Sequence, residues 1–276
     1  MYYDSKKLKR IQEIELDILK EVGRICRIEN IEFFIIGGTA LGAKRHGGFI
    51  PWDDDIDIGM TRENYNKFIS IAPEILEANY FLQTIYTDSE STFSYAKVRY
   101  NGTKFVEWCN RNVNMHKGIY IDIFPYDNIP DDEYERRKQF KIVQLKHKIY
   151  TIATTPDMTS RPISFYDRIK NVLRKSVHII LKIIPKEWLY ESLHKEMCRY
   201  NNIDTNCKGC LLFPKYMTEY MEKNTLYPLK LINFEGIAVP CANNLHKYLT
   251  NHYGEYMELP PENERKGHQP FILDVK

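Results

Sequence analysis

The sequence has no hydrophobic run that is long enough to cross a membrane. Its longest apolar stretch, Val177 to Ile184, is interrupted by Lys182 and followed by Pro185, whereas a spanning helix needs ~20 apolar residues. The opening MYYDSKKLKR has no apolar signal core, and the six cysteines are scattered rather than spaced as a disulfide framework. We therefore expect a cytoplasmic protein with reduced thiols.

Internal repeats and low-complexity tracts are also lacking. The chain has 276 residues, of which 43% are apolar, and this is enough for one large domain or for a domain with an insertion. Helical and strand periodicities alternate along the chain, so we predict a mixed α+β (α/β) fold. We divide it into a core at 1–130, a basic helical insertion at 131–230 and a segment at 231–276 that packs back on the core.

The spacing of apolar residues predicts the individual elements. A helix from about Leu8 closes at Asn30 and leads into a strand at 32–36. Further expected elements are a helix at 61–77, strands at 93–100 and 104–108 joined by a turn at 101–102, a strand at 119–124 ending at Pro125, helices between 131 and 200 with a break at 154–162, strand-like pieces at 232–239 and a helix at 243–252.

The formal net charge of +2 conceals a segregation of charge. Residues 136–199 hold 15 Lys and Arg against 5 Asp and Glu. Within this region Ile169, Val172, Ile180 and Ile184 share one helical face, and basic residues surround it. Two interpretations remain: a core helix with a solvated basic face, which we favour, or a helix resting on an anionic membrane surface. Nucleic acid is not an expected partner, because the basic region lacks interleaved aromatic residues.

The run FIIGGTALGAKRHGGFIPWDDDIDIGM, from Phe34 to Met60, is the most informative part of the chain. It contains four aspartates, Asp53, Asp54, Asp55 and Asp57, in an otherwise apolar segment. Two carboxylates ~4 Å apart repel by about 4 kcal/mol at an effective dielectric constant of ~20. A fold that gathers several of them normally brings in a cation, so we predict a metal site.

Strand alternation narrows the set of metal ligands. It places Asp55 and Asp57 on one face of a strand, and Asp54 on the opposite face in a structural role. Asp122 is the one acidic residue of a second apolar strand and supplies a third carboxylate for a magnesium site. A solvated aspartate turn is the alternative, but the apolar residues on both sides of the cluster argue against it.

Ahead of the cluster, Gly37 and Gly38 form a turn that lets a backbone approach a phosphate closely. Amides at the start of the following helix, from Thr39, are suited to hold the anion.

These motifs closely resemble the LicD family of bacterial phosphocholine and related phosphotransferases, which share their site with the fukutin-type transferases. Three further stretches carry the resemblance, YAKVRYNGT at 95–103, GIYIDIFPYDNIP at 118–130 and YGEYMELPPENERKGH at 253–268. The resemblance implies a nucleotidyltransferase-like core sheet with flanking helices, the helical insertion and a C-terminal segment that closes over the cleft. It also implies that a CDP-activated donor such as CDP-choline transfers its phosphorylated group to a sugar hydroxyl and releases CMP.

The resemblance also implies roles for the aspartates. Asp55 and Asp57 would ligate Mg²⁺ or Mn²⁺, and Asp122 would complete the site and accept the proton of the incoming hydroxyl. Asp53 would be a third ligand or a supporting residue, and we favour the supporting role. The acceptor would be a glycan or a lipid-linked glycan of lipopolysaccharide, teichoic acid or capsule.

Several other residues are candidates for binding the donor. Lys97 and Arg99 alternate on one strand and are placed to meet phosphate, or else they belong to an exposed strand face. Trp52 stacks on the cytosine or fills core, and His46 carries a proton or makes a structural hydrogen bond. The remaining candidates, beside the Gly turn and in the closing motif of the tail, are Arg45, Arg265 and His268.

Two questions stay open at this point. Cys198, Cys207, Cys210 and Cys241 are in range of a structural zinc, or are simply reduced thiols. The transferred group is phosphocholine or another group, such as ribitol phosphate, glycerol phosphate, phosphoethanolamine or aminoethylphosphonate. A true nucleotidyltransferase and a catalytically idle nucleotide-binding protein are the alternative functions.

Overall fold

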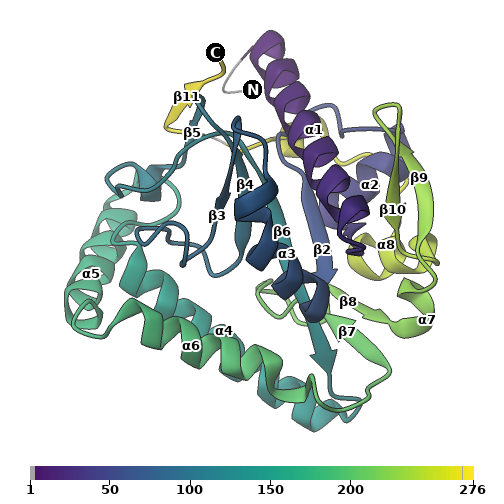
Figure 1. Ribbon diagram of the computed structural model, residues 1–276. Coiled ribbons are helices and arrows are strands. Elements are labelled where there is room, and N and C mark those ends of the chain that lie inside the picture. Colours follow the sequence, from purple (N-terminus) through teal and green to yellow (C-terminus); the bar gives the residue numbers. More distant parts are fainter. Residues whose placement is uncertain (1–3, 269) are drawn as a thin grey trace.

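A central sheet of seven strands organises the fold (Figure 1). The structure, a computed structural model, describes residues 4–268 and 270–276. Its helices are α1 Ser5–Ile28, α2 Gly37–His46, α3 Arg62–Ile75, α4 Glu133–Thr154, α5 Phe165–Leu181, α6 Lys186–Met197, α7 Lys223–Leu226 and α8 Leu245–Tyr253. Its strands are β1 Phe34–Ile35, β2 Asp57–Thr61, β3 Tyr80–Gln83, β4 Ala96–Tyr100, β5 Lys104–Val106, β6 Tyr120–Ile129, β7 Cys207–Gly209, β8 Tyr220–Glu222, β9 Lys230–Phe234, β10 Ile237–Cys241 and β11 Ile272–Asp274. The predicted mixed α/β class is confirmed.

The sheet has the order β1-β2-β6-β4-β3, with β7 added to the far end of β6 and β8 added to β7. Strands β2 and β6 run parallel, and the other pairs are antiparallel. Because β7 and β8 come from the region 131–230, that region contributes strands to the sheet as well as helices. The division into three regions stays a prediction.

Helix α1 packs its apolar stripe on β4 and β6 (Figure 1). Ile11, Ile18 and Val22 are fully buried, and each such side chain contributes about 1.5–3 kcal/mol relative to exposure. The side chain of Asp4 accepts a hydrogen bond from the amide of Lys7 and caps the first turn. The helix that the sequence predicts is confirmed, and Asn30 follows it with a positive φ of 52°.

Strand β6 continues past Pro125 to Ile129, so the prediction that it ends at Pro125 is wrong. The amide of Asp122 points toward β2, where it donates to the carbonyl of Ile56 (2.9 Å). By alternation, position 125 faces the other edge of the strand. On that edge the pairing with β4 ends at Ile123 and the pairing with β7 begins at Asp127. The missing N–H of proline therefore falls in a gap between two ladders and costs no hydrogen bond.

The turn at Asn101–Gly102 is present, and Gly102 has a φ of +78°. The strands on either side of it do not form a hairpin, because β3 and β6 already occupy both edges of β4. Strand β5 pairs instead with β11 near the C-terminus.

Helices α4, α5 and α6 occupy the region that the sequence predicts to be helical and basic, with the expected break between α4 and α5. The favoured interpretation of α5 as a core helix is wrong. Asn171 is its one buried residue, and its apolar side chains are directed to solvent. No helix in the described part of the chain is long and apolar enough to cross a membrane.

Candidate functional site

The sheet brings Asp57 and Asp122 side by side. They are partners in the parallel register of β2 and β6, at the point where both strands begin. The amide of Asp57 donates to the hydroxyl of Thr39 (2.8 Å), so a side chain of α2 holds the backbone in place. Sequence alternation alone does not pair these two aspartates, which lie on separate strands.

Asp55 precedes β2, which begins only at Asp57. The prediction that Asp55 and Asp57 share one face of a regular strand is therefore wrong in its geometry. Asp53 and Asp55 are nevertheless linked by a side-chain hydrogen bond, and the charges of both act on Asp57. Asp53, Asp55, Asp57 and Asp122 thus form one acidic group through their charges, although in the described part of the chain no three of them have ligand atoms within 4.8 Å of one another.

The N-terminus of α2 faces this acidic group. A Cβ atom at Gly37 would lie 3.5 Å from Oδ2 of Asp57, and one at Gly38 would lie 2.9 Å from Oδ2 of Asp53. Gly37 has a φ of +53°, which glycine adopts without strain. Gly38 therefore makes room for the carboxylate of Asp53, whereas the spacing at Gly37 is an ordinary van der Waals contact. The positive end of the helix dipole favours carboxylates at this place. The predicted approach of the two glycines to a phosphate stays a prediction.

The acidic group holds more negative charge than its surroundings neutralise. Burial, reinforced by the charges of Asp55 and Asp54, raises the pKa of Asp53 to about 8. Burial also raises the pKa of Asp57 well above its usual value, and the charges of Asp55 and Asp122 act in the same direction. With a pKa of about 8, Asp53 binds a proton near neutral pH unless a cation replaces it.

Lys97 is the cation closest to Asp122. The two form an ion pair, and the ammonium lies 3.5 Å from the centre of the Tyr120 ring. Arg99 points elsewhere and donates to the carbonyl of Gly118 (2.6 Å) and to the side chain of Gln83. Both basic side chains are 1% exposed, so the alternative of an exposed strand face is wrong.

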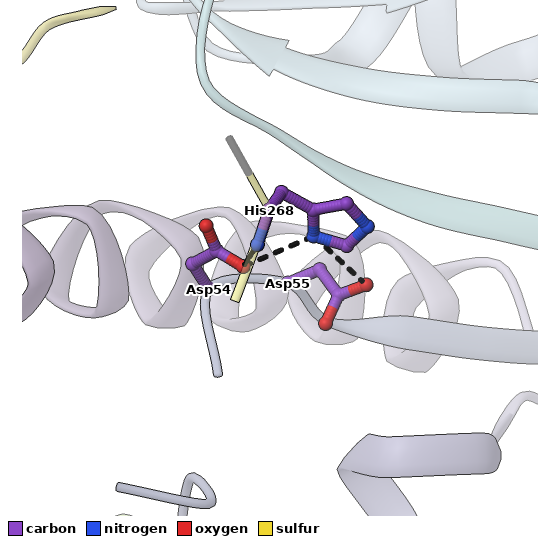
Figure 2. Close-up of side chains that lie close together, drawn as sticks. All are labelled: Asp54, Asp55 and His268. Atoms are coloured by element: carbon purple, nitrogen blue, oxygen red, sulfur yellow. Dashed lines mark hydrogen bonds and ion pairs between the residues drawn. The ribbon is translucent and has the colours of Figure 1, made fainter. Parts of the chain in front are cut away.

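The C-terminal segment reaches the site through His268 (Figure 2). Its amide and its Nδ1 both lie within hydrogen-bonding distance of Oδ1 of Asp54, at 2.9 and 3.0 Å, and Nδ1 is 3.9 Å from Oδ2 of Asp55. The hydrogen bond with Asp54 raises the pKa of His268 to about 10, against the opposing effect of burial. Among the described residues, Asp54, Asp55 and His268 form the one group of His, Cys, Asp or Glu whose ligand atoms all lie within 4.8 Å.

Asp54 therefore does more than the sequence predicts. It precedes β2, so a strand face does not apply to it, and its buried carboxylate anchors the tail.

Other candidates join α2 and the preceding loop to the tail. Arg45 donates to the carbonyls of Tyr256 (2.8 Å) and Glu258 (3.2 Å). The guanidinium of Arg265 lies 5.3 Å from the centre of the Trp52 ring, so it occupies one approach to that ring. The ring of His46 meets Trp52 edge-on at 6.5 Å, and burial together with the charge of Arg45 lowers the pKa of His46. Roles for these residues in donor binding stay predictions.

Glu15 of α1 is a residue near the acidic group that was not predicted from the sequence. Its side chain is buried, and Oε2 has no hydrogen-bond partner. Burial, followed by the charges of Asp55, Asp54 and Asp53, raises its pKa well above the usual value. The sequence did contain a signal for this residue. Glu15 falls four residues after Ile11, so a charged side chain lies on the apolar stripe of α1.

A second set of residues that was not predicted from the sequence supports the start of α2. The hydroxyl of Tyr248 accepts a hydrogen bond from the amide of Gly37 (2.7 Å) and donates one to the buried Glu219 (2.9 Å). Tyr126 also donates to Glu219. No local pattern marks these residues, because they come from three distant parts of the chain.

The four cysteines proposed for zinc contact different neighbours. Sγ of Cys198 lies 3.6 Å from Oδ1 of Asp127, and Sγ of Cys207 lies 2.5 Å from the hydroxyl of Tyr220. Within residues 4–268 and 270–276 the four thiols do not form a group of ligand atoms within 4.8 Å of one another. Structural zinc at Cys198, Cys207, Cys210 and Cys241 stays a prediction, which metal analysis of the purified protein decides.

Comparison with known proteins adds independent information. A family model described as "LicD/FKTN/FKRP, nucleotidyltransferase domain" matches residues 30–164, which include Gly37, Asp57 and Asp122. The lipopolysaccharide cholinephosphotransferase LicD of Haemophilus influenzae is 28% identical over 283 residues, covering 96% of this chain and 98% of that protein. The human ribitol 5-phosphate transferase FKRP is 38% identical over 53 residues, covering 18% of this chain and 11% of that protein.

Proposed function

Since residues 30–164 form a nucleotidyltransferase domain of the LicD family, we propose that this protein transfers a phosphorylated small group from a CDP-activated donor to a sugar hydroxyl of a cell-surface glycan. Phosphocholine is the group that we propose, because the relative that matches nearly the whole chain is a lipopolysaccharide cholinephosphotransferase. CMP is the other product. The match to ribitol 5-phosphate transferase supports phosphotransfer in general.

The observation that carries the proposal is the excess of negative charge at the start of β2 and β6. The oxygen ligands of Asp53, Asp55, Asp57 and Asp122 are those that Mg²⁺ and Mn²⁺ prefer. The raised pKa values of Asp53 and Asp57 and the unpartnered oxygen of Glu15 support a deficit of positive charge, which a divalent cation would supply. Among the described residues only Asp54, Asp55 and His268 have ligand atoms within 4.8 Å of one another, so the four aspartates would have to close around the ion. When bound, such a cation supplies Lewis-acid charge that stabilises negative charge on phosphate oxygens.

The residues of the chain perform the remaining tasks. We assign proton acceptance to the carboxylate of Asp122. Its contacts with Lys97 and with the hydroxyl of Tyr95 (3.4 Å) fix its orientation. The incoming sugar oxygen forms a bond to the phosphorus that carries the small group. The bond between this phosphorus and the bridging oxygen breaks, its electron pair leaves with CMP, and the proton of the hydroxyl passes to Asp122.

The C-terminal segment has a positioning role in this proposal. His268 holds the carboxylate of Asp54 and adds positive charge beside Asp55.

Release of CMP from CDP-choline, measured with and without Mg²⁺ and with candidate acceptor glycans, tests the proposal. Asp57→Asn and Asp122→Asn should each lower the rate by at least about 100-fold, because each removes a charged group next to the reacting phosphate. Asp17→Asn, on the exposed face of α1, is the matched control and should keep the parental rate. Folded Asp57→Asn or Asp122→Asn protein that releases CMP as fast as the parent contradicts the assignment.

A panel of donors decides the transferred group. CDP-ribitol, CDP-glycerol, CDP-ethanolamine and CMP-aminoethylphosphonate are compared with CDP-choline at equal concentration, and the highest metal-dependent rate identifies the natural group. Pyrophosphate release from CTP would instead indicate a true nucleotidyltransferase. Nucleotide binding by calorimetry without metal-dependent release of CMP or pyrophosphate would indicate a catalytically idle member.

A further inference from the structure

Helix α5 is attached to the rest of the protein by its polar side. The side chain of Asn171 donates to Asp157 (2.9 Å), and Arg174 donates to the carbonyl of Thr155 (3.0 Å). Nδ1 of His178 lies 2.9 Å from the carbonyl of Ile152, at the end of α4. These contacts recur every three to four residues, so one polar face of the helix is directed to the protein.

The opposite face of α5 is apolar and lies in solvent. At 100° per residue, the apolar side chains fall on the side of the helix away from Asn171 and His178. Ile169 and Val177 are 42% exposed, and six others are 61% to 83% exposed. The six most prominent are Phe165, Val172, Leu173, Ile179, Ile180 and, just past the helix, Ile183. A contiguous exposed row of this kind is rare in monomeric proteins and marks an interaction surface.

Basic residues border this row on both sides. By helical position Arg168 lies along one border and Lys170 along the other. Lys175 and Lys182 lie nearer to the attached polar face, and Lys175 forms an ion pair with Asp157 (3.1 Å). The one acidic residue of α5, Asp167, is engaged in a capping box with Ser164. The exposed surface of the helix is therefore an apolar row between positive charges.

We propose that α5 lies on the surface of a membrane that contains anionic lipids. The apolar row inserts among the acyl chains, and the bordering Lys and Arg side chains meet the phosphates of the headgroups. Figure 1 shows α5 at the edge of the molecule beside α4, where a flat surface can reach it. The inference rests on exposure and charge alone and does not depend on the proposed reaction.

The positive charge of α5 argues against a second copy of the chain and against nucleic acid as the partner of the apolar row. In a dimer formed through α5, the basic borders of the two copies would face each other without acidic partners on the helix. Nucleic acid would engage the positive charges but would leave the apolar row in water. An anionic lipid surface satisfies both features.

Flotation of the full chain with vesicles tests the proposal. Vesicles of phosphatidylcholine with about one third phosphatidylglycerol should carry the protein at low salt, and pure phosphatidylcholine should carry much less. The double variant Val172→Gln/Ile180→Gln should bind anionic vesicles at least about tenfold more weakly. Leu231→Gln, which changes a side chain that is 71% exposed on β9, is the matched control and should bind like the parent.

The basic border is tested separately. Arg168→Glu/Lys170→Glu should weaken binding to anionic vesicles about 30-fold or more and should remove the preference for phosphatidylglycerol. Lys6→Glu/Lys9→Glu, on the exposed start of α1, is the matched charge control. All four variants change exposed or half-buried side chains, and circular dichroism with thermal unfolding checks that each is folded like the parent.

Two outcomes overturn the proposal. One is that folded parental protein fails to float with anionic vesicles at low salt, or floats equally well when the apolar row is replaced. The other is that light scattering shows a dimer, that Val172→Gln/Ile180→Gln dissociates it, and that the parent does not bind vesicles. A second copy of the chain then covers the row.

Discussion

Replacing Asp53 with Asn should stabilise the metal-free protein, and the gain should increase with pH. Burial and the charges of Asp55 and Asp54 raise the pKa of Asp53 to about 8 in the folded protein, whereas an aspartate in an unfolded chain titrates near ~3.9. Between these values the folded state holds a proton that the unfolded state has released. The stabilising contribution is therefore complete below about pH 4 and is lost as the pH rises through about 8.

The expected magnitude follows from these two pKa values. Each pH unit in this window lowers the free energy of unfolding by ~1.4 kcal/mol, so the loss between about pH 5 and about pH 7.5 is ~3 kcal/mol. Asparagine does not titrate and removes this dependence. The stability of Asp53→Asn relative to the parent should therefore rise by ~3 kcal/mol over the same interval.

Urea unfolding in the presence of EDTA, at about pH 5, 6 and 7.5, measures this difference. His268, whose pKa is raised to about 10, contributes a slope of the same sign, but it is present in both proteins and largely cancels. Glu74→Gln, at an exposed position of α3, is the control and should run parallel to the parent. Addition of Mg²⁺ near pH 7.5 should stabilise the parent more than Asp53→Asn, because binding to the folded state raises its stability.

The reasoning is refuted if the curves of the parent and Asp53→Asn are parallel between about pH 5 and about pH 7.5. It is refuted equally if the variant is the less stable protein near pH 7.5. Either result would mean that the acidic group is neutralised by neighbouring residues and does not need a cation.

Two further predictions concern the support of the site. Asp127→Asn should lower the free energy of unfolding by about 3–5 kcal/mol, because the guanidinium of Arg62 loses a buried carboxylate that it binds at 2.7 and 2.8 Å. Glu222→Gln in an exposed ion pair should cost only ~0–1 kcal/mol in the same urea experiment, and equal costs would contradict the argument. Thr39→Val should cost about 1–3 kcal/mol, because it leaves the amide of Asp57 without an acceptor; parental stability would show that this hydrogen bond is dispensable.

Local patterns predicted much of the fold. The apolar period of α1, the left-handed residue Asn30 at its end and the break between α4 and α5 follow from residues within a few positions of each other. The concentration of aspartates in an apolar segment and the single Asp122 in an apolar strand were equally local signals. The prediction that the strand at 119–124 ends at Pro125 was wrong, because the length of a strand depends on which sheet edges its neighbours occupy.

The orientation of helix α5 could not be predicted from local sequence either. Its periodicity predicted correctly that it is amphipathic, but periodicity does not state which face is directed to the protein. Hydrogen bonds of Asn171, Arg174 and His178 attach the polar face, and the apolar face is left outside. The expectation that the apolar face of α5 packs against the protein was therefore wrong.

The sequence by itself determined the chemistry of this protein: an excess of carboxylates beside a Gly-Gly turn, in motifs of the LicD family. Only the tertiary structure decided how that charge is held. It placed Asp57 beside Asp122 by strand register, buried Glu15 within range of the charges of Asp53, Asp54 and Asp55, and brought His268 to Asp54 across 214 residues. The physical reason is that side-chain identity and spacing are local, whereas burial and the proximity of charges arise only when distant segments pack together.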